Sequence, residues 1–416
     1  MSADGSSSGA RAPRPVFIGG RWVTSRSSLV RDLEDPTTRA VLAEIVESGA
    51  EDVTLACAAA REAHGRWFRT HARDRATALT GVAAAVRAAG EGLARTLTEE
   101  SGRPIRETRA ELAAAVGGLE DAARRGATAQ ADDAAAVGVV AVVAGFDRPI
   151  GAFLQAAGSA IAAGATVICV APLEAPLSSL QLAAAFADLP AGVVNVLTGA
   201  AATTELLAAS GGVDRVLCDG TAEDCETLRR VARGGVERIA PIETIAGVID
   251  EGADLERAAA EAAEGALRAS GQCVTPRVRL YVQRRIAAAF ADQLHVRVAF
   301  LEVGDPRKND TDLGPLISHA AMRRAEEQVA RTLQAGARLK LGGRGFRPWG
   351  LAGHFFQPTI LTEVPRGCAA ALAEFRAPVL SLIPFEDPRD LAEELAMRPA
   401  TLRRLGVADP APPGSR

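Results

Sequence analysis

From Gly138 onward the chain alternates short apolar runs with helical patterns, and this alternation restricts its fold more than any other feature. The apolar runs are predicted strands: Val139–Val143, Thr166–Val170, Val193–Leu197 and Arg215–Leu217. Apolar residues at helical spacing fill the intervals between them. Strands and helices that alternate in this way form βαβ units, in which the strands run parallel and the helices cover the sheet. The sequence therefore predicts an α/β fold with an open parallel sheet.

Helical patterns precede this block, and a second α/β block follows it. The predicted flanking helices and strands are 51–71, 74–99, 107–130, Leu255–Ala269, Val278–Val282, Arg284–Leu294, Ala320–Ala335 and Val379–Phe385. A Gly/Ser-rich start and a Pro/Gly-rich end are typical of disordered termini. The predicted organisation is a disordered leader over 1–15, a first α/β domain over 16–247, a second α/β domain over 248–392 and a short irregular tail over 393–416.

Composition excludes several classes of function. The formal net charge is −4, with both signs interleaved, so no basic surface for nucleic acid is predicted. The apolar stretch 137–172 is broken by Asp147-Arg148-Pro149, which argues against a membrane span. The start lacks the pattern of a signal peptide, and six scattered cysteines predict reduced thiols in the cytoplasm. Their spacing has no metal-binding pattern, so no metal site is predicted.

One segment carries a candidate nucleophile between a predicted helix and a predicted strand: Gly271-Gln272-Cys273-Val274. Other motifs occur in a fixed order along the chain: Phe17–Val23, Glu100-Ser101-Gly102-Arg103-Pro104, Pro190–Gly199, Asp312–Ser318 and Phe355–Thr359. This ordered set resembles the aldehyde dehydrogenase superfamily from about Phe17 to Phe385, where the resemblance ends.

The resemblance implies an aldehyde dehydrogenase-like α/β fold, with a Rossmann-like parallel-sheet cofactor domain and a second α/β catalytic domain. It also implies NAD or NADP as the cofactor. In this family a cysteine thiolate attacks the aldehyde carbonyl, hydride passes to the nicotinamide, and a glutamate activates water to hydrolyse the thioester. The family also has a C-terminal arm for which this sequence shows no match.

The catalytic positions of this chain differ from the family pattern. Without a gap, the family's cysteine corresponds to Val274, and Cys273 lies one residue earlier. Cys273 is then either a displaced nucleophile or a partly buried spectator. The oxyanion-binding asparagine corresponds to Asp147. Its ionised carboxylate would accept but not donate hydrogen bonds at this position. Alternatively, Asp147 pairs with a basic neighbour. The general base corresponds to Ala240, with Glu243 three residues later as a substitute base or a solvated side chain.

The cofactor positions differ as well. The lysine and glutamate that bind the adenosine ribose in the family correspond to Val170 and Leu173. Gly220 and Thr221 lie where the family binds the pyrophosphate, and they also match an ordinary helix start. Glu374 matches the glutamate that holds the nicotinamide ribose.

Three functional hypotheses follow from these differences. In the first, the chain is a catalytically degenerate family member that acts by binding, with an active homologue or a second copy of itself as partner. In the alternative, it is a divergent NAD(P)-dependent aldehyde dehydrogenase that uses Cys273, with Glu243 as base. A third interpretation is a small-molecule binding module that retained the cleft without the chemistry.

Overall fold

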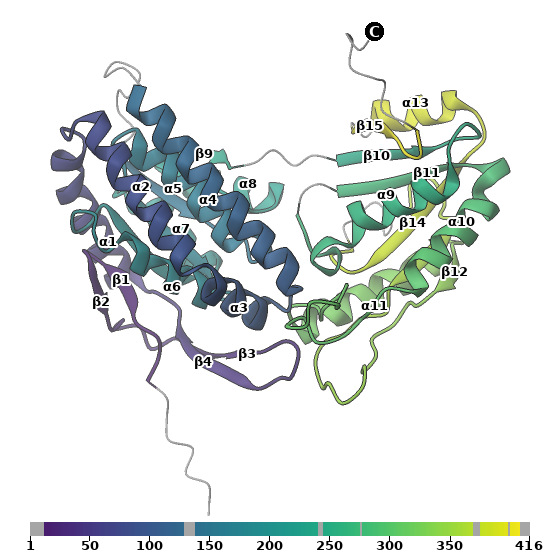
Figure 1. The fold of residues 1–416 in the computed structure, drawn as a ribbon, viewed down its shortest axis with the longest axis horizontal. Helices are drawn as coiled ribbons and strands as arrows, with labels where there is room; N and C mark the ends of the chain where they lie inside the picture. Colours follow the sequence, from purple (N-terminus) through teal and green to yellow (C-terminus); the bar gives the residue numbers. More distant parts are fainter. Residues whose placement is uncertain are drawn as a thin grey trace, which may run out of the picture. The chain divides into compact units, whose positions relative to one another are not determined.

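Residues 12–128, 138–239, 244–274, 277–368, 375–397 and 400–407 are described by a computed structural model. The chain divides into two units (Figure 1). The first contains Met1–Asp35, Arg39–Glu100 and Arg109–Ile239, and the second contains Pro36–Thr38, Ser101–Thr108 and Ala240–Arg416. Each unit is built around its own sheet, as the α/β prediction requires.

The first unit has a seven-stranded sheet in the order β2-β1-β7-β6-β5-β8-β9. Its strands are β1 (Val16–Ile18), β2 (Arg21–Val23), β5 (Val139–Val143), β6 (Thr166–Pro172), β7 (Val194–Gly199), β8 (Arg215–Cys218) and β9 (Gly235–Arg238). The last five run parallel, and only the β1–β2 hairpin joins them antiparallel. The predicted parallel sheet is therefore confirmed.

Helices surround this sheet, and apolar side chains fill both of its faces. They are α1 (Ala50–Trp67), α2 (Ala72–Ala88), α3 (Gly90–Ser101), α4 (Ile105–Thr128), α5 (Pro149–Ala162), α6 (Leu177–Ala183), α7 (Ala201–Ala209) and α8 (Ala222–Val231). A 3-10 turn, η2 (Ala184–Phe186), extends α6. Every residue of β6 is buried, as expected for a central parallel strand covered on both sides.

Two local predictions for this unit differ from the structure. The single helix predicted over 74–99 is two helices, because α2 ends at Ala88 and α3 begins at Gly90. Glycine is a poor helix former, which favours a break at this point. A hairpin of β3 (Val30–Glu34) and β4 (Val41–Val46) is not among the predicted elements.

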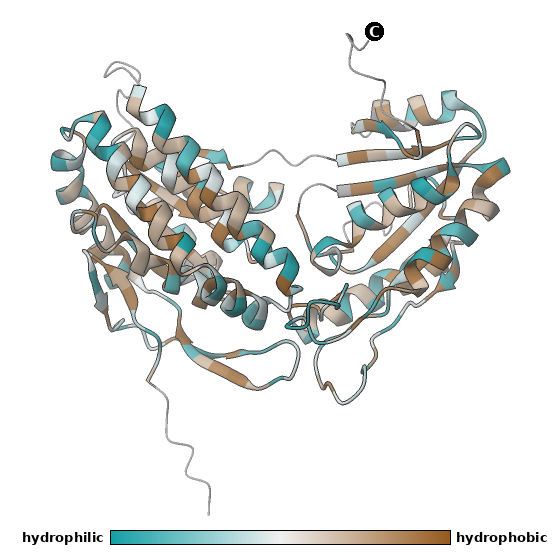
Figure 2. Cartoon of the chain, in the orientation of Figure 1, coloured by the Kyte–Doolittle hydropathy of each residue, from teal (hydrophilic) through white to brown (hydrophobic). Residues whose placement is uncertain are grey.

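The second unit has a six-stranded sheet in the order β12-β13-β14-β11-β10-β15. The strands are β10 (Thr244–Ile249), β11 (Arg277–Gln283), β12 (Arg338–Leu341), β13 (Thr359–Thr362), β14 (Val379–Phe385) and β15 (Thr401–Arg404). All pairs are parallel except β12–β13. The accompanying helices are α9 (Leu255–Leu267), α10 (Arg284–Ala299), α11 (His319–Gln334) and α13 (Pro388–Met397). Figure 2 shows β14 as mostly hydrophobic, in keeping with its central place.

The ends of the second domain differ from the sequence-based boundaries. The boundary placed after residue 247 falls inside β10, which pairs with β11 along its whole length. Residues 401–404, assigned to an irregular tail, form β15 and pair parallel with β10. The side chains of β15 are exposed, so backbone pairing rather than an apolar pattern holds this strand, and periodicity could not reveal it. None of the described helices is long and apolar enough to cross a membrane.

The buried carboxylate of Glu100 accepts hydrogen bonds at the N-terminus of helix α6, and its ionisation should affect the stability of the protein. It is fully buried and accepts the N–H groups of Leu177 and Ser178 at 2.6 and 3.0 Å. Burial raises its pKa to about 8, against the opposing effect of these hydrogen bonds. Because the folded-state pKa lies above the ordinary carboxyl value of 4.5, stability is highest at low pH and falls as the pH rises towards 8.

We therefore expect the wild type to lose stability relative to Glu100→Gln between about pH 5 and about pH 8, by on the order of a few kcal/mol. Glutamine has a similar shape but does not ionise. Urea unfolding of both proteins across this range measures the difference. Parallel stability profiles would show that the carboxylate is ionised throughout.

Candidate active site

In the second unit, the chain between α9 and β11 makes a left-handed turn just before Cys273. Ala269, Ser270 and Gly271 have φ values of 49°, 54° and 72°. Left-handed backbone costs roughly 1–2 kcal/mol for a residue other than glycine. At Gly271 an added Cβ would lie 2.1 Å from the carbonyl oxygen of Ala377, so only glycine fits. Strain of this kind is concentrated at functional sites.

Three hydrogen bonds tether this turn to the rest of the unit. The Ala269 N–H donates to Glu107 Oε2 at 2.9 Å, and Ser270 Oγ donates to the Gly314 carbonyl at 2.9 Å. Gln272 Oε1 accepts the N–H of Ile317 at 2.8 Å. These contacts offset the strain and fix the position of the following residue.

The structure separates the two residues that compete for the nucleophile position. Cys273 is half-buried, and its Sγ donates to the Arg268 carbonyl at 3.8 Å. Val274 is buried, with 7% of its surface exposed. The other five cysteines are buried. The accessible thiol at the turn is therefore Cys273, one residue before the slot that the ungapped comparison predicts.

Glu107 is a site residue that the sequence analysis missed. It lies on α4, and Arg103 Nε is 3.9 Å from its carboxylate. Burial raises the pKa of Glu107, and the charge of Arg103 opposes this shift. The Arg103/Glu107 pair has the four-residue spacing of neighbours on a helix, which could have suggested the contact. Nothing in the sequence linked it to residue 269.

Three predicted site positions lie outside the described residues: Ala240, Glu243 and Glu374. Their roles as base position, substitute base and nicotinamide-ribose ligand stay predictions.

In the first unit, the loops after β5 and β8 lie side by side at the point where the strand order reverses. This is the place where doubly wound sheets bind their ligands. Asp147 follows β5 and is 3% exposed, and Asp219 follows β8 and is 9% exposed. A Cβ on Gly145 would lie 2.8 Å from Asp147 Oδ1 and 2.6 Å from the Asp219 carbonyl oxygen, so glycine lets the two loops approach.

An ion pair links these two loops. Arg148 at the start of α5 donates to Asp219 Oδ1 at 2.8 Å. Burial lowers the pKa of Arg148, but the charges of Asp219, Asp147 and Glu111 outweigh it and raise the pKa overall. Glu111 also accepts the Gly151 N–H at 2.8 Å, in the first turn of α5. The charges of three carboxylates, Asp219, Asp147 and Glu111, therefore act on the Arg148 guanidinium.

Gly220 and Thr221 form the start of α8. Thr221 Oγ1 accepts the N–H of Asp224 at 3.1 Å, and Asp224 Oδ2 accepts the N–H of Thr221 at 2.8 Å, which is a capping box. The Arg238 guanidinium donates a hydrogen bond to the Gly220 carbonyl. Gly220 and Thr221 therefore precede a helix, as both interpretations of these residues require, and a phosphate here would share the helix end with the Asp224 carboxylate.

The positions that correspond to the ribose ligands of the family are apolar and buried. Val170 is 1% exposed within β6, and Leu173 is 4% exposed beside Leu33 and Ile45. Neither side chain can donate or accept a hydrogen bond to a hydroxyl group.

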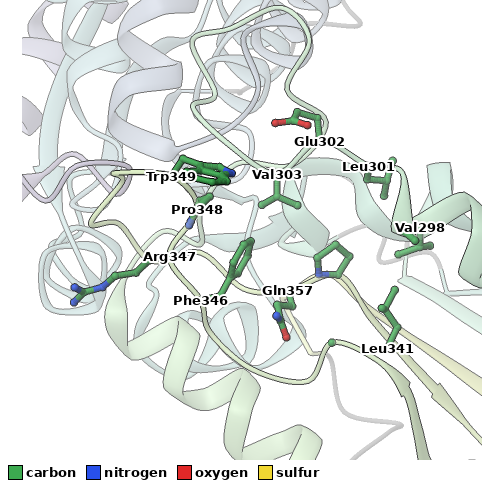
Figure 3. A pocket seen from close by; sticks show the side chains of 13 residues that line it. Val298, Leu301, Glu302, Val303, Leu341, Phe346, Arg347, Pro348, Trp349 and Gln357 are labelled. Atoms are coloured by element: carbon green, nitrogen blue, oxygen red, sulfur yellow. The ribbon is translucent and has the colours of Figure 1, made fainter.

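A separate pocket of about 720 Å³ lies in the second unit. Phe346 and Val303 face its interior, and Arg347 points away (Figure 3). Of the predicted site residues that the structure describes, none lines it. Within the described residues, no group of three or more His, Cys, Asp or Glu is arranged to hold a metal ion.

Comparison with known proteins agrees with the fold and the order of motifs. A model of the aldehyde dehydrogenase family matches residues 22–398, which extends the resemblance beyond Phe385. Succinate-semialdehyde dehydrogenase [NADP(+)] of Escherichia coli (strain K12) is 30% identical over 90% of this chain and 81% of its own. Glutarate-semialdehyde dehydrogenase of Pseudomonas aeruginosa is 30% identical over 92% of this chain and 82% of its own.

Solved structures show the same relationship. Lactaldehyde dehydrogenase from Escherichia coli has a TM-score of 0.87 at 25% identity, covering 96% of this chain and 87% of its own. A 3,6-anhydro-L-galactose dehydrogenase in complex with NAP has a TM-score of 0.86 at 26% identity, covering 92% and 84%. This chain therefore belongs to the aldehyde dehydrogenase family.

Proposed function

We propose that this protein is a divergent NAD(P)-dependent aldehyde dehydrogenase that oxidises an aldehyde to an acid through Cys273. The observation that carries the proposal is the half-buried thiol of Cys273 on a strained turn with three tethers. Nucleophilic catalysis requires a thiol that is fixed in position and accessible to the substrate. The named relatives are aldehyde dehydrogenases, which supports catalysis more than its loss.

The chemistry assigned to this chain begins with the thiol. The Cys273 thiolate attacks the aldehyde carbon and forms a hemithioacetal. Loss of hydride converts it to a thioester, and water then releases the acid and restores the thiol. NAD or NADP, when bound, supplies the hydride acceptor. The base that activates water is assigned to Glu243, the glutamate three residues after Ala240, where the resemblance places the base of the family.

The residues of the first unit fit this cofactor in part. Arg148 and the N-terminus of α8 carry positive charge suited to a pyrophosphate, but Asp219 pairs with Arg148 and Asp224 caps α8. Val170 and Leu173 do not match a ribose. The cofactor would therefore bind mainly through its phosphates, and weakly.

A second candidate function is binding without catalysis, as a degenerate member that associates with an active homologue or with itself. It is favoured by the buried Asp147 at the oxyanion position and by the apolar ribose positions. An aspartate cannot donate a hydrogen bond to a developing oxyanion when ionised.

Turnover measurements separate these functions. The purified chain is assayed for NADH or NADPH formation with succinate semialdehyde, glutarate semialdehyde and lactaldehyde, the substrates named for its relatives. Turnover of any of them supports the dehydrogenase. Calorimetric binding of NAD or NADP with no turnover would favour the degenerate protein, and absence of both would remove the dehydrogenase proposal.

A further inference from the structure

One peptide group connects a half-buried carboxylate with the candidate nucleophile. The N–H side of the Arg268–Ala269 peptide donates to Glu107 Oε2 at 2.9 Å. The C=O side of the same peptide accepts from Cys273 Sγ at 3.8 Å. Glu107 and Cys273 therefore lie at opposite ends of one hydrogen-bonded chain. Hydrogen bonds in such a chain polarise one another.

Charged groups around Glu107 come from two elements. Arg103 precedes α4 and has its Nε 3.9 Å from the carboxylate, and the Arg103 and Glu107 side chains are 6% and 20% exposed. Arg106 lies on α4 and Arg268 lies in the turn next to Ala269, and the positive charges of both also act on Glu107. Burial raises the pKa of Glu107, and these three cations together with the Ala269 N–H oppose the shift. The carboxylate thus lies among three cations and accepts a hydrogen bond from the turn.

The backbone of the turn depends on such contacts. Ala269 and Ser270 adopt left-handed conformations that residues with a side chain rarely take without support. The Glu107 hydrogen bond is made at Ala269, the first of these residues. If it were lost, this peptide could rotate and its carbonyl would no longer face the thiol.

We propose that Glu107 is a positioning residue for Cys273 and acts through the Arg268–Ala269 peptide group. Its carboxylate holds the peptide so that the Arg268 carbonyl accepts the thiol proton. This arrangement favours the neutral thiol, because both the carbonyl dipole and the carboxylate charge disfavour a thiolate. The thiol is then kept in its protonated form until an aldehyde and a base are present. The inference rests on the proposed function, since it assigns this role towards the same nucleophile.

The test is the pH dependence of Cys273 alkylation by iodoacetamide in the full chain, followed by peptide mass spectrometry. The isosteric Glu107→Gln removes the charge. We expect its alkylation midpoint to fall by about half to one pH unit, which makes labelling near neutral pH about three- to tenfold faster. Glu326→Gln is the matched control, because Glu326 also accepts a backbone N–H, that of Gly345 at 2.9 Å. Its midpoint should equal that of the wild type.

A purely structural role would lower the melting temperature of Glu107→Gln without moving the midpoint of the folded protein, and that result would overturn the proposal. If the single variant does not fold, Glu107→Gln/Ala269→Gly takes its place, because glycine adopts the left-handed turn without support. The same downward shift is expected. Labelling reports on Glu107 whether or not the enzyme turns over, whereas activity in a Cys273→Ser variant would refute only the proposed function.

Discussion

Cys273→Ser is expected to abolish aldehyde oxidation, with a loss of at least about 10³-fold in kcat. A serine hydroxyl at this position is a much weaker nucleophile than a thiol, and the catalytic base of the family activates water rather than a hydroxyl side chain. Steady-state NADH or NADPH formation measures the effect. Cys368→Ser is a suitable control, because Cys368 is a buried cysteine of the same unit outside the turn.

The position of the nucleophile can be tested separately. Val274 is 7% exposed, so a cysteine placed there should have an inaccessible thiol. The double variant Cys273→Ser/Val274→Cys is therefore expected to remain inactive. Recovery of activity would mean that residue 274 occupies the family's catalytic slot and that the turn rearranges in the working protein.

Asp219→Thr is expected to tighten NADP and NAD binding by about tenfold, which corresponds to about 1.4 kcal/mol. The Asp219 carboxylate lies directly before Gly220 and Thr221, where two phosphates would be placed. It also engages Arg148 at 2.8 Å. Threonine removes the repulsion and frees the guanidinium to pair with a phosphate. Isothermal titration calorimetry measures the dissociation constants.

Two further variants make this result interpretable. Asp390→Thr removes an aspartate that also pairs with an arginine, Arg366, in the second unit, and should leave affinity unchanged. Arg148→Gln should weaken binding. Unchanged affinity in Asp219→Thr would show that the start of α8 does not bind the pyrophosphate.

Much of the fold was predictable, because alternation of apolar runs with helical patterns reports directly on burial. β5 and β14 have the predicted bounds, Val139–Val143 and Val379–Phe385. β15 was not predicted, since a strand held by backbone pairing has no side-chain pattern. The prediction of a single helix over 74–99 was wrong for a related reason. Apolar residues at helical spacing continue across the break before Gly90, so the pattern does not show that the helix ends there.

The sequence by itself determined the family and the parallel sheets, because motifs and periodicity are local properties of the chain. Its replacements at the usual catalytic positions stay predictions. Only the tertiary structure decided which side chains meet. It left Cys273 half-buried and Val274 buried. It also joined Arg148 to Asp219 and Glu107 to Ala269. These pairs are 71 and 162 residues apart, and contacts at such separations depend on how the elements pack, which no local pattern specifies.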